Sequence, residues 1–208
     1  ALYDPVGDTG AMLNRLEIPF RSVGATEKAT PEEILVLGRR ALDADESVAA
    51  VANLTGSGRI LVFEQSAAAL QRRLGFRVNI HGCRSVFTRS ADHPALADLS
   101  DVLLRNWRGS ATLVPPYIET EAVEAGYLRW DWCGFSSTRV WRCGTRGSVA
   151  TVLIEKPPRG NWLPIMDCGF DLQYSPLLEF TDARKRIVFC QLDVTERSVP
   201  DPVADHVL

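Results

Sequence analysis

The sequence lacks any apolar run near the roughly 20 residues of a membrane-spanning helix, although 46% of its 208 residues are hydrophobic. It also lacks an excess of positive charge, because 23 Lys and Arg residues stand against 26 Asp and Glu, for a net charge of −3. Its longest basic run is the triplet at 184–186. We therefore expect no membrane span and no nucleic-acid surface.

Closely spaced cysteines are also absent. No pair of the five cysteines comes closer than the ten residues that separate Cys133 from Cys143, so neither a zinc site nor a CxxC redox motif is expected. We interpret the cysteines as small buried hydrophobic residues; the alternative is one disulfide, which would indicate an oxidising compartment. His81, His93 and His206 show no metal-ligand spacing, and we predict no metal and no cofactor.

The clearest positive signal is the stretch 56–74. A glycine-rich turn precedes a short continuous apolar run at 59–63, which is typical of a strand buried inside a parallel sheet. Ser66 is a suitable N-cap for the helical pattern that follows, and Gly75 is suited to end it. A strand joined directly to a helix is half of a βαβ unit, and ligands bind at the carboxyl ends of such strands.

Short apolar runs elsewhere predict more elements of the same kind. We expect further strands at 1–3, 20–23 and 33–37, helices at about 12–16 and 47–54, a hairpin from 176–180 and 187–192, and a last helix that begins near 200. Strands that alternate with helices predict an α/β fold with a parallel sheet covered on both faces.

Residues 76–175 do not follow this alternation. They predict one or two strands within 76–88, a short helix within 95–107 and a hairpin from 138–143 and 148–155, and they contain all five tryptophans. We interpret this part as an antiparallel, Trp-rich elaboration or insertion on a single domain that spans 1–208. Because the chain starts in a strand and stops within its last expected helix, we expect a piece of a larger protein.

The order of these pieces resembles a known superfamily. The pieces are LVLG at 35–38, a following helix, GRILV at 58–62, LLEF at 177–180 and RIVF at 186–189. Together they resemble the class I glutamine amidotransferase-like superfamily, and within it the accessory domains of bacterial glycoside hydrolases, such as β-galactosidase trimerisation domains, and trehalose-utilisation-type proteins. The resemblance covers 1–75 and 176–197, and it implies a flavodoxin-like three-layer fold with a mostly parallel sheet.

The sequence departs from the catalytic pattern of that superfamily. An active amidotransferase has a cysteine nucleophile after the strand that corresponds to 59–63, and a histidine base after the last strand. Here Glu64 and Gln65 occupy the first place, and Asp193 occupies the second. A carboxylate cannot replace both a thiol and the base that activates it. The resemblance therefore implies a domain without amidotransferase chemistry.

Polar residues follow four of the expected strands, at Asp4, Arg39, Glu64 with Gln65, and Asp193, and we expect them to meet in one crevice. In a functional interpretation, Arg39 binds a carboxylate or sugar hydroxyls, while Glu64 and Asp193 act as acceptors or as an acid/base pair. In the alternative interpretation, which we prefer, Arg39 neutralises the carboxylates of a crevice that holds no ligand.

Trp130 and Trp132 form a second candidate site. If their segment is extended, both indoles point to the same side. Exposed indoles would stack on sugar rings, whereas buried ones would pack the elaboration onto the core or a neighbouring domain. We prefer burial, because large aromatic side chains dominate cores and interfaces.

These observations predict a non-catalytic accessory or assembly domain of a carbohydrate-active, glycoside hydrolase-like protein. Its expected partners are other domains of a larger chain or further copies of itself. The alternatives are a small hydrolase that acts on a sugar or an amide through Glu64 and Asp193, and a carbohydrate-binding module that uses Trp130 and Trp132. The compartment stays open: periplasmic or extracellular for part of a glycoside hydrolase, and cytoplasmic otherwise.

Overall fold

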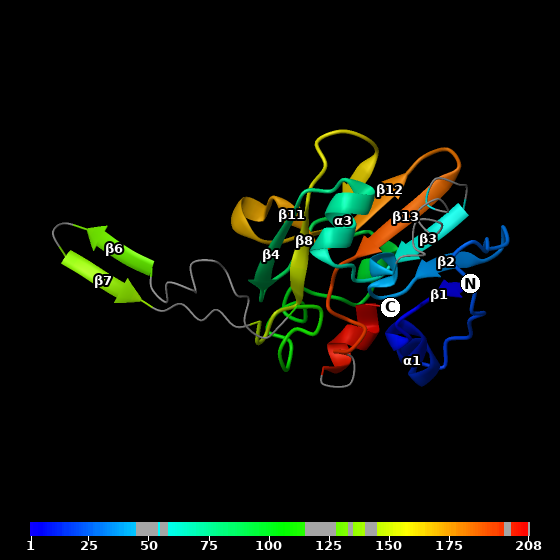
Figure 1. The fold of residues 1–208 in the computed structure, drawn as a ribbon, viewed down its shortest axis with the longest axis horizontal. Coiled ribbons are helices and arrows are strands. Elements are labelled where there is room, and N and C mark those ends of the chain that lie inside the picture. Colours follow the sequence, from blue (N-terminus) through cyan, green and yellow to red (C-terminus); the bar gives the residue numbers. More distant parts are fainter. Residues whose placement is uncertain are drawn as a thin grey trace.

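The computed structural model describes residues 1–44, 54, 58–114, 128–132, 135–139, 145–197 and 201–207, and describes only the backbone at 128–132, 135–139 and 206–207. Within these residues the chain is a mixed α/β protein whose largest sheet combines parallel and antiparallel strands. Two α-helices and several 3₁₀ turns connect the described strands (Figure 1).

Six strands form the main sheet, in the order β1-β2-β3-β13-β12-β9. The first four strands run parallel to one another, whereas β12 runs antiparallel to both of its neighbours, β13 and β9. These strands are β1 (Leu2–Tyr3), β2 (Ile34–Leu37), β3 (Gly58–Val62), β9 (Trp162–Pro164), β12 (Leu177–Thr181) and β13 (Lys185–Cys190). The predicted strands at 33–37 and 59–63 and the predicted late hairpin are therefore confirmed as β2, β3 and the β12–β13 pair.

Alternate residues of the parallel strands pack into two cores, because successive side chains of a strand point to opposite faces. On β3, Ile60 and Val62 belong to the core that contains α3 (Ala67–Leu74), whereas Leu61 packs against the core that contains α1 (Asp8–Arg15). Strands β2 and β13 alternate in the same way. Both faces of these strands are thus covered, which explains their continuous apolar runs.

The corner between β3 and α3 follows the local signals of the sequence. Ser66 is the N-cap of α3, and its hydroxyl oxygen accepts a hydrogen bond from the Ala69 amide at 3.1 Å. Gly75 ends the helix in the left-handed conformation, with φ of 73°, which glycine adopts without steric cost. Both predictions are confirmed, and this corner fixes where Glu64 and Gln65 lie.

Antiparallel strands make up much of the middle of the chain, as predicted. One sheet has the order β11-β8-β4, and two pairs, β10–β5 and β6–β7, accompany it. The bounds are β4 (Val78–Cys83), β5 (Phe87–Thr88), β6 (Leu128–Trp132), β7 (Phe135–Arg139), β8 (Ala150–Glu155), β10 (Met166–Asp167) and β11 (Tyr174–Ser175). Because β9 lies in the same stretch but pairs with β12, this part of the chain is joined to the main sheet.

Four short 3₁₀ helices complete the described elements. They are η1 (Ala41–Asp43), η2 (Pro94–Leu96), η3 (Phe170–Leu172) and η4 (Pro202–Val207). Figure 1 shows η4 beside α1, near the amino-terminal end of the fold, and an ion pair of 2.9 Å between Arg15 and Asp205 joins the two. In the described part of the chain, no helix is both long and apolar enough to cross a membrane.

Some predicted elements differ from the structure. The apolar stripe at 95–107 forms turns after η2, because Asp98 and Asn106 adopt positive φ values of 62° and 52° that interrupt a helix. The strand predicted at 20–23 is reduced to two hydrogen bonds, of 2.8 and 2.9 Å, between its backbone and Leu2. The last predicted helix is the 3₁₀ helix η4.

The hairpin predicted from 138–143 and 148–155 is also different. Strand β8 pairs with β4 and β11, and β7 pairs with β6. Strand β8 thus lies between β11 and β4 inside a sheet, and it is buried along almost its whole length. Residues 140–144 and most of the helix predicted at 47–54 lie outside the described residues.

Candidate functional site

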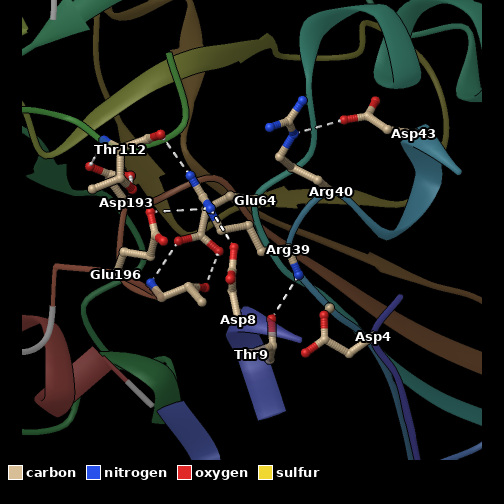
Figure 2. Close-up of polar contacts among 12 residues, drawn as sticks. Asp4, Asp8, Thr9, Arg39, Arg40, Asp43, Glu64, Thr112, Asp193 and Glu196 are labelled. Carbon is tan, nitrogen blue, oxygen red and sulfur yellow. Dashed lines mark hydrogen bonds and ion pairs between the residues drawn. The ribbon is translucent and has the colours of Figure 1, made fainter. Parts of the chain in front are cut away.

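The strand-end residues predicted from the sequence lie at one edge of the parallel sheet (Figure 2). Asp4 directly follows β1, Arg39 follows β2, Glu64 and Gln65 follow β3, and Asp193 follows β13. Because these four strands are parallel and adjacent, their carboxyl ends lie together. The side chains differ, however, in what they contact.

Asp4 and Gly38 hold the ends of β1 and β2 close together. The Asp4 Oδ2 atom accepts a hydrogen bond of 2.7 Å from the Gly10 amide in the first turns of α1. The other carboxylate oxygen lies so close to Gly38 that a Cβ atom there would come within 2.5 Å of it. Asp4 therefore positions α1 against the sheet, and a side chain at position 38 has no space.

Arg39 is buried, and the protein itself supplies its charged partners. Its Nη1 atom lies 2.7 Å from the Asp8 carboxylate and 3.2 Å from that of Glu196. Its Nη2 atom donates to the Thr112 carbonyl at 2.7 Å, and its backbone amide donates to the Thr9 hydroxyl at 2.7 Å. The guanidinium thus joins the start of α1 to the segment after β13, and the carboxylates of Asp8 and of the more exposed Glu196 balance its charge.

Glu64 has no solvent-exposed surface, with a relative exposure of 0%. Its two carboxylate oxygens accept hydrogen bonds from the backbone amide and the hydroxyl of Thr195, at 2.8 and 2.6 Å. Burial raises the pKa of the Glu64 carboxyl to about 7, while the Thr195 donors oppose this shift and the nearby Asp193 charge adds to it. A carboxyl group with a pKa near 7 suits general-acid chemistry, but here its oxygens are bonded within the core.

Gln65 uses its whole side chain to join strand ends. Its Oε1 atom accepts from the Leu42 amide at 2.8 Å, and its Nε2 atom donates to the carbonyls of Gly38 and Phe63 at 2.8 and 2.6 Å. The Gln191 side chain in turn bonds both backbone groups of Gln65, at 2.8 and 3.0 Å. These two hydrogen bonds connect the end of β3 to the end of β13. Both glutamines are almost fully buried.

Asp193 is buried beside Arg197, and both side chains have a relative exposure of 1%. The Asp193 carboxylate accepts hydrogen bonds from the Thr112 amide and hydroxyl, at 3.0 and 2.7 Å, and from Arg197 Nη1 at 3.0 Å. The Nη2 atom of Arg197 donates to the Trp107 carbonyl at 3.0 Å. The cation that pairs with Asp193 is therefore Arg197, whereas Arg39 pairs with other carboxylates.

Thr112 connects two of the predicted residues, because its carbonyl binds Arg39 while its amide and hydroxyl bind Asp193 (Figure 2). Thr112 belongs to the stretch 76–175, which the sequence suggested was an elaboration. Part of that stretch therefore lies over the strand ends and uses their polar groups internally.

The structure thus brings the predicted residues together in two groups. Arg39 and Asp193 meet through Thr112, and Asp4 and Gln65 meet at Gly38. Glu64 lies in the field of Asp193, but Thr195 binds its oxygens. That these residues bind a ligand or catalyse a reaction stays a prediction.

The Trp130 and Trp132 site remains a prediction as well. Both residues belong to β6, whose backbone is extended as expected. Their side chains lie outside the described residues.

The described residues offer no site with the ligands of a metal ion. None of their His, Cys, Asp and Glu side chains form a group of three or more that could hold one. One pocket, of about 230 Å³, lies away from the strand-end residues. Its lining residues are Gly75, Phe76, Arg77, Glu155, Lys156, Pro157 and Pro158.

The sequence did not identify the residues that donate hydrogen bonds to the predicted carboxylates, Thr195 and Thr112. Thr195 could have been predicted as a site residue, because it follows β13 closely, on the same segment as Asp193. Thr112 gave no signal, since it is distant in sequence from every strand that it serves. The partners of a buried carboxylate are set by tertiary structure, which local patterns do not encode.

The sequence matches no model of a known protein family, and a search of curated proteins gives no match.

Proposed function

We propose that this chain is a non-catalytic, glutamine amidotransferase-like domain that serves assembly within a carbohydrate-active protein. The proposal includes a flavodoxin-like, three-layer arrangement of its parallel part. Two observations support that arrangement: α1 and α3 pack into different cores, and alternate residues of β3 point into each. The resemblance of the strand sequences to that superfamily supports the rest.

One observation carries the non-catalytic role: the corner after β3 is built for internal bonding. This is the place of the nucleophile in an active amidotransferase, and here Glu64 is fully buried with both carboxylate oxygens bound by Thr195. Gln65 next to it is bound on all sides by Leu42, Gly38 and Gln191. A group that reacts with a substrate must be reachable from solvent, and these groups are not.

The described thiol that lies in the field of Glu64 cannot replace the missing nucleophile. Cys190 lies within β13 and is buried. Burial raises the pKa of its thiol, and the nearby Glu64 raises it further. Because the thiolate is the nucleophilic form, a thiol held protonated in the core does not attack an amide.

A test of catalysis measures ammonia release from L-glutamine and hydrolysis of a panel of nitrophenyl glycosides by the purified chain. We expect no turnover above buffer for the wild-type protein or for Glu64→Gln. An active amidotransferase and an active glycosidase serve as positive controls. Turnover that is present in the wild type and lost in Glu64→Gln would overturn the proposal in favour of the Glu64/Asp193 hydrolase.

The assembly role is supported by an apolar surface at the edge strand β4. We call this the β4 edge surface, and it consists of His81 in β4 and Phe170 in η3. Phe170 is 66% exposed, and its ring lies 5.1 Å from that of His81. Ile80 and Leu172 are also exposed. Among the described strands only β8 pairs with β4, so the outer edge of β4 suits a second copy of the same strand, related by a twofold axis.

Sedimentation velocity over a range of protein concentrations tests this surface. We expect the wild-type chain to self-associate and Phe170→Ser to shift the equilibrium towards the monomer by at least tenfold in dissociation constant. Val102→Ser is the matched control, because Val102 is also highly exposed but belongs to another segment. A wild-type chain that stays monomeric, or equal effects of both substitutions, would remove the β4 edge surface from the proposal.

A further inference from the structure

The pocket of about 230 Å³ lies where the carboxyl ends of α3 and β8 meet. Gly75, Phe76 and Arg77 line it from the connection between α3 and β4, and residues 155–158 line it from the end of β8. Its volume is below the roughly 300–1,000 Å³ of sites for drug-sized ligands. A ligand of this pocket is therefore about the size of one amino acid or one sugar ring.

One part of the lining is apolar and held in place. The Phe76 ring packs edge-on against the rings of Trp162 and Phe189, with centroid distances of 5.4 and 5.1 Å. Pro157 and Pro158 follow β8, and their pyrrolidine rings fix the backbone φ angles there. Because these groups are already ordered, an apolar group that binds against them costs little further ordering.

Two other lining side chains carry opposite charges and are weakly paired. The Glu155 amide donates to the Arg77 carbonyl at 2.9 Å, so the two residues face each other on neighbouring segments. Arg77 Nη1 lies 3.5 Å from Glu155 Oε1, and the side chains are 84% and 35% exposed. Among the described residues, neither side chain has another polar contact. A pair of this kind adds little to stability, and both groups remain available to a ligand.

Lys156 differs, because the protein already uses its charge. Its Nζ atom lies 2.9 Å from the Asp167 carboxylate, which also accepts a hydrogen bond of 2.8 Å from Arg89. Two cations thus share one buried carboxylate. This side of the pocket keeps an excess of positive charge, which favours an anionic group of a ligand beside Arg77.

An amino acid with an apolar side chain matches all parts of this lining. Its carboxylate can accept two parallel hydrogen bonds from the Arg77 guanidinium, and its ammonium can donate to the Glu155 carboxylate. Both groups of an amino acid are attached to one carbon, which matches two side-chain charges that lie 3.5 Å apart. A neutral sugar offers no charge to either side chain, and a simple carboxylate offers none to Glu155.

We propose that this pocket binds a free α-amino acid with an apolar side chain, held through Arg77 and Glu155. The ligand side chain lies against Phe76 and the two prolines. The inference goes beyond the proposed function and does not depend on it, because the lining contains no strand-end residue and no residue of the β4 edge surface.

An NMR titration of the isotope-labelled wild-type chain with L-phenylalanine tests the site. We expect saturable shifts at the amides that line the pocket, those of Gly75, Phe76, Arg77, Glu155 and Lys156. The expected Kd is about 1 mM, as suits a ligand of about a dozen non-hydrogen atoms in an open site. An absence of saturable shifts at these amides up to about 20 mM would overturn the proposal.

Related compounds test the chemical class on the same wild-type protein. Hydrocinnamate is phenylalanine without its ammonium group, phenethylamine lacks the carboxylate, and glycine lacks the apolar side chain. Each should bind at least about fivefold more weakly than L-phenylalanine, because each leaves one part of the lining unmatched. Equal or tighter binding of hydrocinnamate, D-glucose or D-glucuronate would overturn the assignment to an amino acid.

Variants test the two charged residues separately. We expect Arg77→Gln and Glu155→Gln each to raise the Kd for L-phenylalanine at least about fivefold. Glu155→Gln should bind hydrocinnamate as tightly as the wild type does, since that ligand has no ammonium to lose. Arg105→Gln and Glu32→Gln are the matched controls, because both side chains are exposed on other segments. If a variant does not fold, the wild-type ligand series still decides, and equal effects of all four substitutions would contradict the proposed contacts.

Discussion

At the scale of single residues, Glu64 makes stability depend on pH. The folded protein raises the pKa of this carboxyl from 4.5 to about 7, so the folded state binds its proton more tightly than the unfolded state does. The contribution of Glu64 to stability is therefore fully present below about pH 4.5 and is lost as the pH rises to about 7. This difference in pKa corresponds to about 3 kcal/mol at most.

We predict that Glu64→Gln removes this pH dependence. The glutamine carbonyl can accept from the Thr195 amide and its amino group can donate to the Thr195 hydroxyl, so the contacts of the protonated acid are preserved. The free energy of unfolding is measured by urea titration at pH 5 and at pH 8. From pH 5 to pH 8 it should fall by about 2 to 3 kcal/mol more in the wild type than in Glu64→Gln.

The control for this experiment is Glu32→Gln, whose side chain is exposed. Its pH profile should follow that of the wild type. Parallel profiles for wild type and Glu64→Gln would show that the Glu64 carboxyl is ionised in the folded protein throughout this range.

A second residue-scale prediction concerns Arg197 and Asp193. Arg197→Met leaves the Asp193 charge buried without its cation, and we expect a loss of about 3 to 5 kcal/mol in the free energy of unfolding. Asp193→Asn in the same chain removes that charge and should recover part of the loss. Chemical denaturation of the three variants measures this coupling. Strictly additive effects would mean that the two side chains do not interact energetically.

At the scale of elements, the ends of β1 and β2 depend on a glycine. We expect Gly38→Ala to destabilise the protein by about 2 to 4 kcal/mol, because the new Cβ atom would lie within 2.5 Å of the Asp4 carboxylate. Asp4→Ala should partly relieve this clash in a double variant. Gly24→Ala is the matched control, since a Cβ atom at position 24 would have open space within 4 Å. Urea unfolding followed by circular dichroism gives the free energy of unfolding of the wild type, Gly38→Ala, the double variant and Gly24→Ala. Equal losses of stability in Gly38→Ala and Gly24→Ala would be inconsistent with this close approach.

Elements defined by local signals were predictable from the sequence. The β3–α3 corner was expected where it occurs, because Ser66 and Gly75 act on neighbouring backbone groups. The pairing of β8 with β4 was not predictable, since it joins Val78 to Ile154 across a long stretch of chain. At the candidate site, the positions of the strand-end residues followed from the order of strands, whereas their partners, such as Thr112, depend on how distant segments pack.

At the scale of the whole molecule, the polar bonds between Thr112 and the strand ends predict that the two parts of the chain unfold together. Cys190 in β13 and Cys83 in β4 are buried reporters in the main sheet and in the β11-β8-β4 sheet. Under reducing conditions in increasing urea, we expect both thiols to become open to alkylation at the same midpoint. Mass spectrometry distinguishes the sites. Midpoints that differ clearly would indicate two independently folding units.

The place of β13 in the main sheet has a consequence for synthesis. This strand lies between β3 and β12, yet it follows every other described strand in the sequence and leaves the ribosome after them. Until then, β3 presents an unpaired apolar edge to its surroundings. During synthesis, the chain is therefore most prone to pair with other chains along the edge of β3 in the interval before β13 is added.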